Sequence, residues 1–320
     1  MLRKLSILIF LIESSVLLLF PETKAFFNDD PLEFEGIFLK FLESAKYSIK
    51  LVSFNLDHRK IEDVLKRKAK ETDVFVVVDD RYKNKVKYLE DFGVHIICDE
   101  RSDENKALIH SKFVIVDDSK VWFGSANLTE SSFSRDHNFA FVSDERWMVD
   151  AFRKEFENFL EGRFHNEKDR IMGSSKSDML VFSPKNDVMD IIVREISKTR
   201  RKVYISMYAF TNRLIMDQLK VLSSNGVEVM VMYDESWNKS SEYSVIEDGR
   251  EYILTVADPF HGLLHDKFIL IDPEKRCSLI CGSYNLTLSA NRRNDEFVLI
   301  THDKNLCEIF KSEFEEMLKY

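Results

Sequence analysis

The chain has 320 residues, of which 44% are hydrophobic and 32% are charged. This balance is typical of a soluble globular protein with one large or two ordinary domains, and it excludes a low-complexity or disordered chain. With 46 basic and 55 acidic residues, the formal net charge is -9. The chain as a whole therefore lacks the positive charge typical of proteins that bind the nucleic-acid backbone, although a local basic groove is compatible with this balance.

The N-terminal segment has the layout of a secretory signal peptide. Two basic residues, Arg3 and Lys4, precede an apolar run. The run ends at Phe20, and the small residue Ala25 follows closely; the run is short for the roughly 20 residues that span a bilayer. We therefore predict a signal peptide over residues 1–25 and a secreted or periplasmic protein, with an uncleaved membrane anchor as the alternative.

The next predicted elements are a strand, a helix and two further strands. A proline follows Asp30, which is a typical helix start, and apolar residues then recur at helical spacing up to Leu42. The unbroken apolar run in "VFVVVDD", residues 74–80, predicts a strand covered on both faces of its sheet. The closing pair, Asp79 and Asp80, is interpreted as a strand end that needs no metal.

The stretch "LIHSKFVIVDD", residues 108–118, is predicted to be a buried strand that carries two cationic side chains. His110 and Lys112 stand two positions apart, so both point to the same face, about 7 Å apart along the strand. Asp117 falls on the opposite face and is interpreted as a residue that fixes the motif structurally.

A Gly-Ser-x-Asn motif follows this strand. It contributes Ser125 and Asn127, and Asn138 begins the next predicted strand. An amphipathic helix over residues 146–161 then closes this part of the chain. The polar stretch 162–178 is predicted as a linker.

The chain after the linker repeats this order of elements. His265 lies 155 positions after His110, within "LHDKFILIDP". We therefore predict two similar halves, residues 26–165 and 178–320. The second half holds an equivalent for each motif position of the first: His265, Lys267, Asp272, Ser283, Asn285 and Glu296.

Alternating strands and helices in each half predict an α/β fold. We expect two similar mixed, largely parallel β-sheet halves that are flanked by helices and packed about a pseudo-twofold axis, like a two-fold dimer fused into one chain. Under that symmetry the two motifs meet, so the site is complete within one chain.

The four cysteines do not form a metal-binding cluster. Cys277 and Cys281 flank a strand-like segment that would hold them about 13 Å apart, which is too far for a disulfide. We therefore predict buried thiols, although a secreted location permits other bridges.

The paired motifs His-x-Lys-x4-Asp and Gly-Ser-x-Asn resemble the signature of the phospholipase D superfamily over residues 26–320. Both copies are intact, and the pair is far more specific than one His-x-Lys would be. The resemblance implies a two-step phosphodiester cleavage through a phosphohistidine, without a metal or other cofactor. The family's usual order makes His110 the nucleophile and His265 the general acid.

The residue types suit a phosphodiester substrate. Lys112 and Lys267 supply positive charge for its nonbridging oxygens. Neutral hydrogen-bond donors come from the second motif, which supplies Ser125, Asn127, Ser283 and Asn285. Two histidines can divide the nucleophile and acid roles, because imidazole titrates near pH 6.5 and its surroundings shift it readily.

Carboxylates commonly orient the histidines in this family, and the sequence departs from that pattern in one half. In the second half Glu296 is an acidic residue, as the family pattern requires, whereas in the first half the equivalent position is Asn138. An amide can hold an imidazole but cannot stabilise its cation by charge. The asymmetry is expected either to help decide which histidine stays neutral or to weaken activity.

Three functions follow as hypotheses. A phospholipase D-type phosphodiesterase would hydrolyse or transfer phospholipid head groups at a membrane surface. A metal-independent endonuclease of the same superfamily would cleave nucleic acid; the compact chain favours it and the acidic charge disfavours it. A phosphate- or membrane-binding protein without turnover has support only from Asn138. The other histidines are interpreted as ordinary core, surface or loop-shaping residues: His58, His95, His137, His165, His261 and His302.

Overall fold

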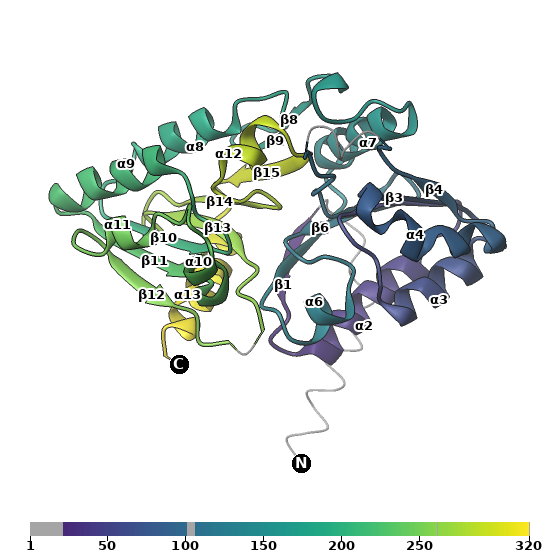
Figure 1. Cartoon of the computed structure of the whole chain (residues 1–320), viewed down its shortest axis with the longest axis horizontal. Helices are drawn as coiled ribbons and strands as arrows, with labels where there is room; N and C mark the ends of the chain where they lie inside the picture. The colour runs from purple at the N-terminus through teal and green to yellow at the C-terminus, as the bar shows by residue number, and fades with distance from the viewer. Residues whose placement is uncertain (1–21, 101–105, 261, 320) are drawn as a thin grey trace, which may run out of the picture.

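The computed structural model describes residues 22–100, 106–260 and 262–319. Two α/β halves lie side by side, the first coloured purple to teal and the second green to yellow (Figure 1). Each half contains one mixed sheet flanked by helices, which confirms the predicted α/β fold of two similar halves. The expectation of largely parallel sheets is wrong, because most neighbouring strands in each sheet are antiparallel. Residues 1–21 of the predicted signal peptide and His261 lie outside the described residues, and none of the described helices is long and apolar enough to cross a membrane.

The first sheet has seven strands in the order β1-β7-β6-β5-β2-β3-β4. The part β2-β3-β4 is parallel, and the other neighbours are antiparallel. Valines dominate β3 because β-branched side chains fit a sheet covered on both faces. The strands are β1 (Thr23–Phe27), β2 (Ser48–Ser53), β3 (Asp73–Val78), β4 (His95–Ile97), β5 (Phe113–Val116), β6 (Lys120–Gly124) and β7 (Phe139–Ser143).

The second sheet has eight strands in the order β12-β11-β10-β13-β14-β15-β9-β8. Its parallel part is β10-β11-β12, which matches β2-β3-β4 of the first half. The strands are β8 (Met172–Ser174), β9 (Met179–Ser183), β10 (Lys202–Met207), β11 (Glu228–Tyr233), β12 (Leu254–Ala257), β13 (Lys267–Ile271), β14 (Ser278–Gly282) and β15 (Glu296–Thr301).

Helices cover both sheets, and several of them begin at a capping side chain. Asp30, for example, accepts hydrogen bonds from the N–H groups of Leu32 and Glu33 at the start of α2. The α-helices are α2 (Pro31–Glu43), α3 (Arg59–Lys68), α4 (Lys83–Val86), α6 (Glu130–Ser134), α7 (Arg146–Leu160), α8 (Val188–Ile196), α9 (Arg213–Ser224), α10 (Glu235–Ser240), α11 (Ile246–Gly249), α12 (Leu288–Arg292) and α13 (Lys304–Met317). Short 3₁₀ helices occupy Asp80–Tyr82, Lys87–Phe92 and His165–Glu167.

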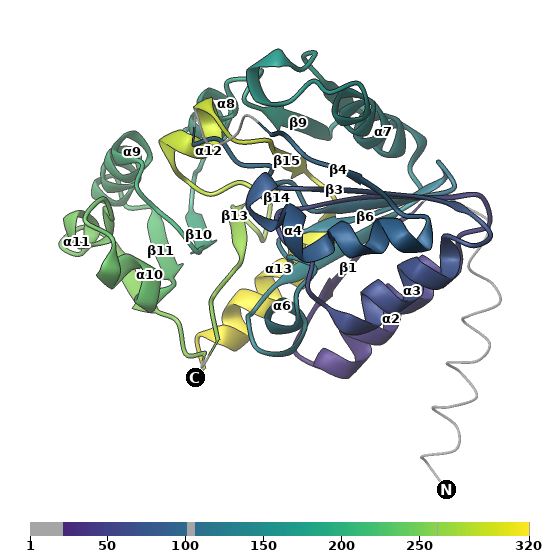
Figure 2. The same cartoon turned by 45° about the vertical axis from the view of Figure 1, so that its right-hand side comes forward.

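Aromatic side chains join the two halves into one core. Phe310 of α13 contacts Phe139 in the first sheet and Phe268 in the second, with ring centroids 5.2 and 5.1 Å apart. Reciprocally, Phe152 of α7 contacts Phe297 of β15 at 5.1 Å. Figure 2 shows α13 of the second half beside β1 of the first. The halves are therefore held in a fixed relation, and the loops between them meet in a defined geometry.

Two predicted boundaries contain more structure than expected. β1 begins at Thr23 and pairs with β7, so a cut after Ala25 would remove three of its five residues. The predicted linker 162–178 includes β8, and its Lys168 is buried in an ion pair with Asp295 at 2.8 Å. The linker thus forms an edge of the second sheet and part of the contact between the halves.

The prediction of buried thiols is confirmed for Cys281 alone, because two cysteines form a disulfide and Cys98 is half-buried. Cys277 and Cys307 form a disulfide, with Cα atoms 6.3 Å apart, whereas Cys98 and Cys281 are free. The spacing argument tested only Cys277 against Cys281. It could not anticipate that α13, which carries Cys307, packs beside β13 and β14.

Replacing Cys277 and Cys307 by alanine together is expected to lower the free energy of unfolding by about 3–4 kcal/mol, because a closed loop of this length restricts the unfolded chain. Urea unfolding of the double variant measures the loss. The Cys98→Ala variant removes a thiol that forms no disulfide and is the control. An unchanged midpoint in the double variant would contradict the assignment of this crosslink as stabilising.

Candidate active site

The two His-x-Lys motifs lie at the boundary between the halves. β5 begins only at Phe113, so His110 and Lys112 precede the strand on which they were predicted. The N–H of His110 donates to the carbonyl of Asp295 at 3.0 Å, and the N–H of His265 donates to the carbonyl of His137 at 2.9 Å. Each motif therefore uses a backbone hydrogen bond to the opposite half, which is why the segment does not continue its own sheet.

A carboxylate anchors the residue before each of these histidines. Asp79, at the end of β3, accepts a hydrogen bond from the N–H of Ile109 at 3.0 Å. Asp234, at the end of β11, accepts one from the N–H of Leu264 at 3.0 Å. Burial raises the pKa of Asp79 to about 6. From the sequence, Asp79 was interpreted only as a strand end. Its equivalence to Asp234 in the repeat was the available signal for this anchoring role.

Each histidine ring is held by a side chain from the other half. Nδ1 of His110 lies 2.8 Å from Oε2 of Glu296, and Nδ1 of His265 lies 2.9 Å from Oδ1 of Asn138. The exchange follows the pseudo-twofold relation, and in each ring Nδ1 is the nitrogen that the opposite half holds. The asymmetry expected from the sequence is therefore located behind His265, which has an amide where His110 has a carboxyl group.

The serines of the two Gly-Ser-x-Asn motifs donate hydrogen bonds to Asn138 and Glu296. The hydroxyl of Ser283 donates to Oε2 of Glu296 at 2.7 Å, and that of Ser125 donates to Oδ1 of Asn138 at 3.0 Å. The serines were predicted as substrate-binding donors. In the structure their hydroxyls instead donate to Asn138 and Glu296. Each of these acceptors stands at the start of the strand that follows the serine's own motif.

The asparagines of the same motif differ from each other. Oδ1 of Asn285 accepts a hydrogen bond from the N–H of Ala209 at 3.3 Å, which directs its amide nitrogen away from that backbone. Oδ1 of Asn127 is buried and has no partner among the described residues. Both side chains are half-buried, so an oxygen-rich ligand can reach their amide groups.

Four basic groups share one buried site, and their charges repel one another. Burial and the charges of Lys112 and Lys267 hold the pKa of His110 well below its ordinary value, and the same causes lower that of His265. Burial lowers the pKa of Lys112 to about 7. Burial and then Lys112 lower that of Lys267 strongly. A bound anion would relieve this repulsion, so the site is preorganised for negative charge.

Glu296 is the acidic partner in this site. Burial raises its pKa to about 8, against the opposing influence of Lys112, Ser283 and the other neighbours. The pKa of Glu296 therefore lies close to that of Lys112. A negative ligand that keeps the lysines charged also favours the ionised carboxylate through them.

Asp117 and Asp272 lie outside this cluster, as their interpretation as structural residues required. Asp117 accepts hydrogen bonds from the N–H groups of Lys46, Tyr47 and Ser48 at 2.7–3.1 Å. Asp272 binds the N–H groups at the start of β10 in the same way. These carboxylates join the far end of each motif strand to its neighbour and do not contact the reacting groups.

Two aromatic pairs flank the histidines symmetrically. Phe54 contacts the ring of His110 at 5.5 Å and the ring of Tyr82 at 5.0 Å. In the second half, Tyr208 contacts the ring of His265 at 5.1 Å and that of Trp237 at 6.0 Å. All four aromatic residues are half-buried. These residues were not predicted as part of the site, although they occupy equivalent places in the two repeats.

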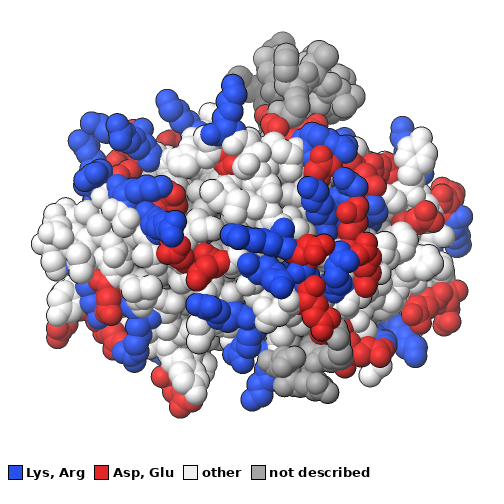
Figure 3. Space-filling view, turned by 90° about the horizontal axis from the view of Figure 1, so that it is seen from above, with Lys and Arg blue, Asp and Glu red and all other residues white. Residues whose placement is uncertain are grey.

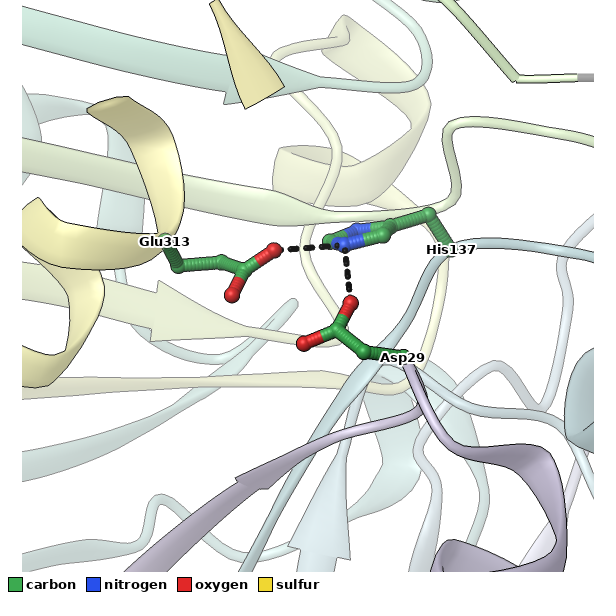
Figure 4. A group of neighbouring side chains, drawn as sticks. All are labelled: Asp29, His137 and Glu313. Carbon is green, nitrogen blue, oxygen red and sulfur yellow. Dashed lines mark hydrogen bonds and ion pairs between the residues drawn. The ribbon is translucent and has the colours of Figure 1, made fainter. Parts of the chain in front are cut away.

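A buried histidine also connects the halves beside this site. Asp266 lies 2.7 Å from one ring nitrogen of His137. Figure 4 shows the contacts of the other nitrogen, with Glu313 at 2.9 Å and Asp29 at 3.5 Å. Burial opposes the charge of His137, but Asp266 and the neighbouring carboxylates raise its pKa well above its ordinary value. The imidazolium thus fixes the loop before Lys267.

Three of these residues also have the spacing of a metal site. The ligand atoms of Asp29, His137 and Glu313 lie within 4.8 Å of one another. A divalent cation could bind there only after His137 lost the proton that its carboxylate neighbours stabilise. The contacts of His137 are accounted for by its role in shaping the loop, as predicted from the sequence.

Replacing Asn138 by aspartate is expected to raise the pKa of His265 by about 1–3 units, because a carboxylate would then face its Nδ1–H. The alkaline limb of the pH profile of kcat should move upward if His265 acts as the acid. The Glu296→Gln variant gives the matched change behind His110. An unaltered alkaline limb in the Asn138→Asp variant would contradict the assignment of His265.

Comparison with known proteins was consistent with the paired motifs. The family model described as "Cardiolipin synthase, PLD-like domain" matches residues 38–160 and 192–318, which is one match per half. A Rickettsia prowazekii protein named phospholipase D is 32% identical over 130 residues, or 40% of this chain and 62% of that protein. The human protein named mitochondrial cardiolipin hydrolase is 30% identical over 128 residues, or 39% of this chain and 49% of that protein.

The fold of the whole chain also has a solved counterpart. The structure of phosphatidylserine synthase from Haemophilus influenzae has a TM-score of 0.68, covers 91% of this chain and 85% of that one, and is 12% identical in sequence. This likeness concerns the fold. The curated relatives align with less than two thirds of their own length.

Proposed function

The chain belongs to the family of phospholipase D-like proteins, and from this we propose that it is a phosphodiesterase that hydrolyses or transfers phospholipid head groups through a phosphohistidine. One observation carries the proposal: His110 and His265 are each held by the opposite half, in one buried site shared with two lysines. Such a site presents two imidazoles and two ammonium groups to one phosphate.

The first step forms a bond between Nε2 of His110 and phosphorus. Glu296 holds Nδ1 of this ring, while Lys112 and Lys267 neutralise the nonbridging oxygens. The bond from phosphorus to the leaving alcohol breaks, and His265 gives that oxygen a proton. The bound phosphate supports the protonated form of His265, which the empty site disfavours through burial and the neighbouring cations.

The second step releases the phosphate. His265, now neutral, takes a proton from water, or from an acceptor alcohol in a transfer reaction. The oxygen attacks phosphorus, and the bond to His110 breaks. His110 leaves as the neutral imidazole that the site favours, and His265 is protonated again for the next cycle.

A lipid substrate is favoured over nucleic acid by the groups around the site. The aromatic pairs offer apolar surface beside both histidines. Three lysines that follow the ends of β3 and β11 are paired with acids: Lys83 with Glu100, Lys85 with Asp57 and Lys239 with Glu235. Figure 3 shows blue and red groups interleaved on the face seen from above Figure 1. The names of the Rickettsia and human relatives also refer to lipid cleavage.

We further propose export of the protein. The basic start and apolar run of the first 20 residues support it, and the Cys277–Cys307 disulfide suits an oxidising compartment. Because β1 begins at Thr23, a cleavage site just before that residue would keep the strand whole. N-terminal sequencing of the protein recovered from the producing cell tests this proposal.

The substrate class is tested with phosphatidylcholine, phosphatidylglycerol and single-stranded DNA, each offered to the protein in excess chelator. We expect release of a head-group alcohol from at least one lipid and no cleavage of DNA. Cleavage of DNA alone would establish the nuclease alternative instead. Tight binding of both lipids without product would leave a binding protein, and loss of turnover with chelator would contradict the metal-independent steps.

A further inference from the structure

Three large apolar side chains of the second half are exposed beside the active site. Leu214, Tyr243 and Leu288 are 60%, 70% and 66% exposed. Leu214 stands in the first turn of α9, Leu288 begins α12, and Tyr243 lies in the loop after α10. We call these three residues the apolar edge.

Sheet topology brings the three residues to the same side of the second half. β10 and β11 are parallel, and both β10 and β14 are antiparallel to β13. The carboxyl ends of β10, β11 and β14 therefore share one edge of the sheet, and the apolar edge follows these ends. His265 precedes β13 and so lies at this same edge.

Backbone hydrogen bonds hold the loops of the apolar edge together. The N–H of Thr211 donates to the carbonyl of Leu286 at 3.0 Å, and that of Val245 donates to the carbonyl of Phe210 at 3.1 Å. These bonds link the segments before α9, before α12 and after α10. The apolar edge is thus a surface of fixed shape close to Tyr208, whose ring contacts His265.

The first half does not repeat this apolar character. In the aligned repeats, Leu214 corresponds to Lys60 and Leu288 to Glu130. Lys60 forms an ion pair with Glu35 at 2.6 Å, and Glu130 accepts a hydrogen bond from the N–H of Arg59 at 3.0 Å. The first half thus uses charged side chains, in contacts of its own, where the second half exposes leucines.

Arginines stand next to the apolar edge. Arg292 and Arg293 end α12, and both are exposed. Arg293 makes a hydrogen bond to Ser289, and no acidic partner is recorded for it within the described residues. Apolar side chains flanked by arginine are typical of surfaces that lie at the boundary between lipid head groups and acyl chains.

We propose that the apolar edge docks the protein on a phospholipid bilayer, with Leu214, Tyr243 and Leu288 entering the acyl boundary and Arg293 facing the head groups. This inference rests on the proposed function, because a phospholipid presents its phosphodiester at the bilayer surface. Docking through this edge brings the side of the sheet that carries His265 to the depth of that group. The second half faces the membrane, and the first half completes the site from the other side.

The first experiment measures binding to vesicles without turnover. The Leu214→Lys/Leu288→Glu double variant copies the residues of the first half and leaves the net charge unchanged. In sedimentation with vesicles of phosphatidylcholine and phosphatidylglycerol, we expect its partitioning to fall at least about tenfold, since two leucines no longer leave water. Val221→Lys changes a 55% exposed residue toward the other end of α9 and should bind like the wild type.

The second experiment separates docking from catalysis. On a short-chain phosphatidylcholine kept below its micelle concentration, the double variant should retain kcat/KM within about twofold, while its rate on vesicles falls with its binding. Equal losses on both substrates, or unchanged vesicle binding, would overturn the docking surface. So would a wild-type dimer in light scattering that the double variant dissociates, because a second copy would then cover the edge. If the wild type binds vesicles through these leucines but cleaves no phospholipid, the docking surface stands and the proposed function fails.

Discussion

The His110→Ala variant is expected to lower kcat/KM for a phosphodiester by at least about 10⁴-fold, because it removes the group that bonds to phosphorus. No other neutral nitrogen takes its place, since the remaining ring is held by Asn138 on the opposite side of the site. Steady-state hydrolysis of bis(4-nitrophenyl) phosphate measures the loss. His302→Gln, which changes an exposed histidine whose ring contacts Ser177 and Asp178, is the control.

The partner variant, His265→Ala, should depend on the leaving group. For an alkyl alcohol, which needs a proton on departure, the expected loss is about 10²–10⁴-fold. For 4-nitrophenol, which leaves without a proton, the first step should lose far less, and the covalent intermediate should accumulate. Full activity in both histidine variants would refute the two-histidine mechanism.

Affinity for the phosphodiester is expected to weaken as pH rises above about 7. The pKa of Lys112 is about 7 in the empty site, because burial disfavours its ammonium form. A bound anion stabilises that form and so raises its pKa. Below pH 7 the lysine is already charged, whereas above pH 7 binding must take up a proton, and kcat/KM then falls by up to tenfold per pH unit for this group.

The Lys112→Arg variant provides a direct check of this pH dependence. A guanidinium stays charged throughout the range, so this variant should lose the part of the alkaline decline that belongs to Lys112. Lys112→Met should instead lose about 10²–10³-fold in kcat/KM below pH 7, because a donor to the developing charge is absent. The loss should shrink at higher pH, where the wild-type lysine itself gives up its charge. A decline of equal slope in wild type and Lys112→Arg would assign the titration to another group, such as Lys267.

The repeated halves and their motifs could be predicted from the sequence because both are local patterns. The 155-residue offset between His110 and His265 defined equivalent positions, and the alternation of strands and helices defined the fold class. The structural interpretation of Asp117 followed from strand periodicity alone, and its carboxylate does bind backbone N–H groups away from the site.

The contacts of Glu296 with His110 and of Asn138 with His265, each made across the boundary between the halves, could not be predicted in the same way. Whether Glu296 faces His110 or His265 depends on how two rigid halves pack, and that packing is decided by Phe310 and other core aromatics far from the motifs in sequence. The hydroxyl of Ser283 was misplaced for a different reason: its acceptor, Glu296, comes from the strand that follows its motif within the same half.

The disulfide was missed because spacing along one strand says nothing of a helix that packs across it. Cys307 reaches Cys277 only once α13 lies beside β13 and β14. The apolar edge was missed because single exposed leucines are ordinary on any surface. The three residues form one surface only because β10, β11 and β14 run in the same direction, so that their carboxyl ends lie at the same edge of the sheet.

The central claim is that His110 and His265 act in turn on one phosphodiester held between the halves. Its most direct test is mass spectrometry of the His265→Ala variant, quenched at alkaline pH during turnover of bis(4-nitrophenyl) phosphate. The account predicts one phosphoryl adduct per chain, located on the peptide that contains His110 and absent from the His110→Ala variant. An adduct on another residue, or rapid turnover that builds up no adduct in the His265→Ala variant, would contradict it.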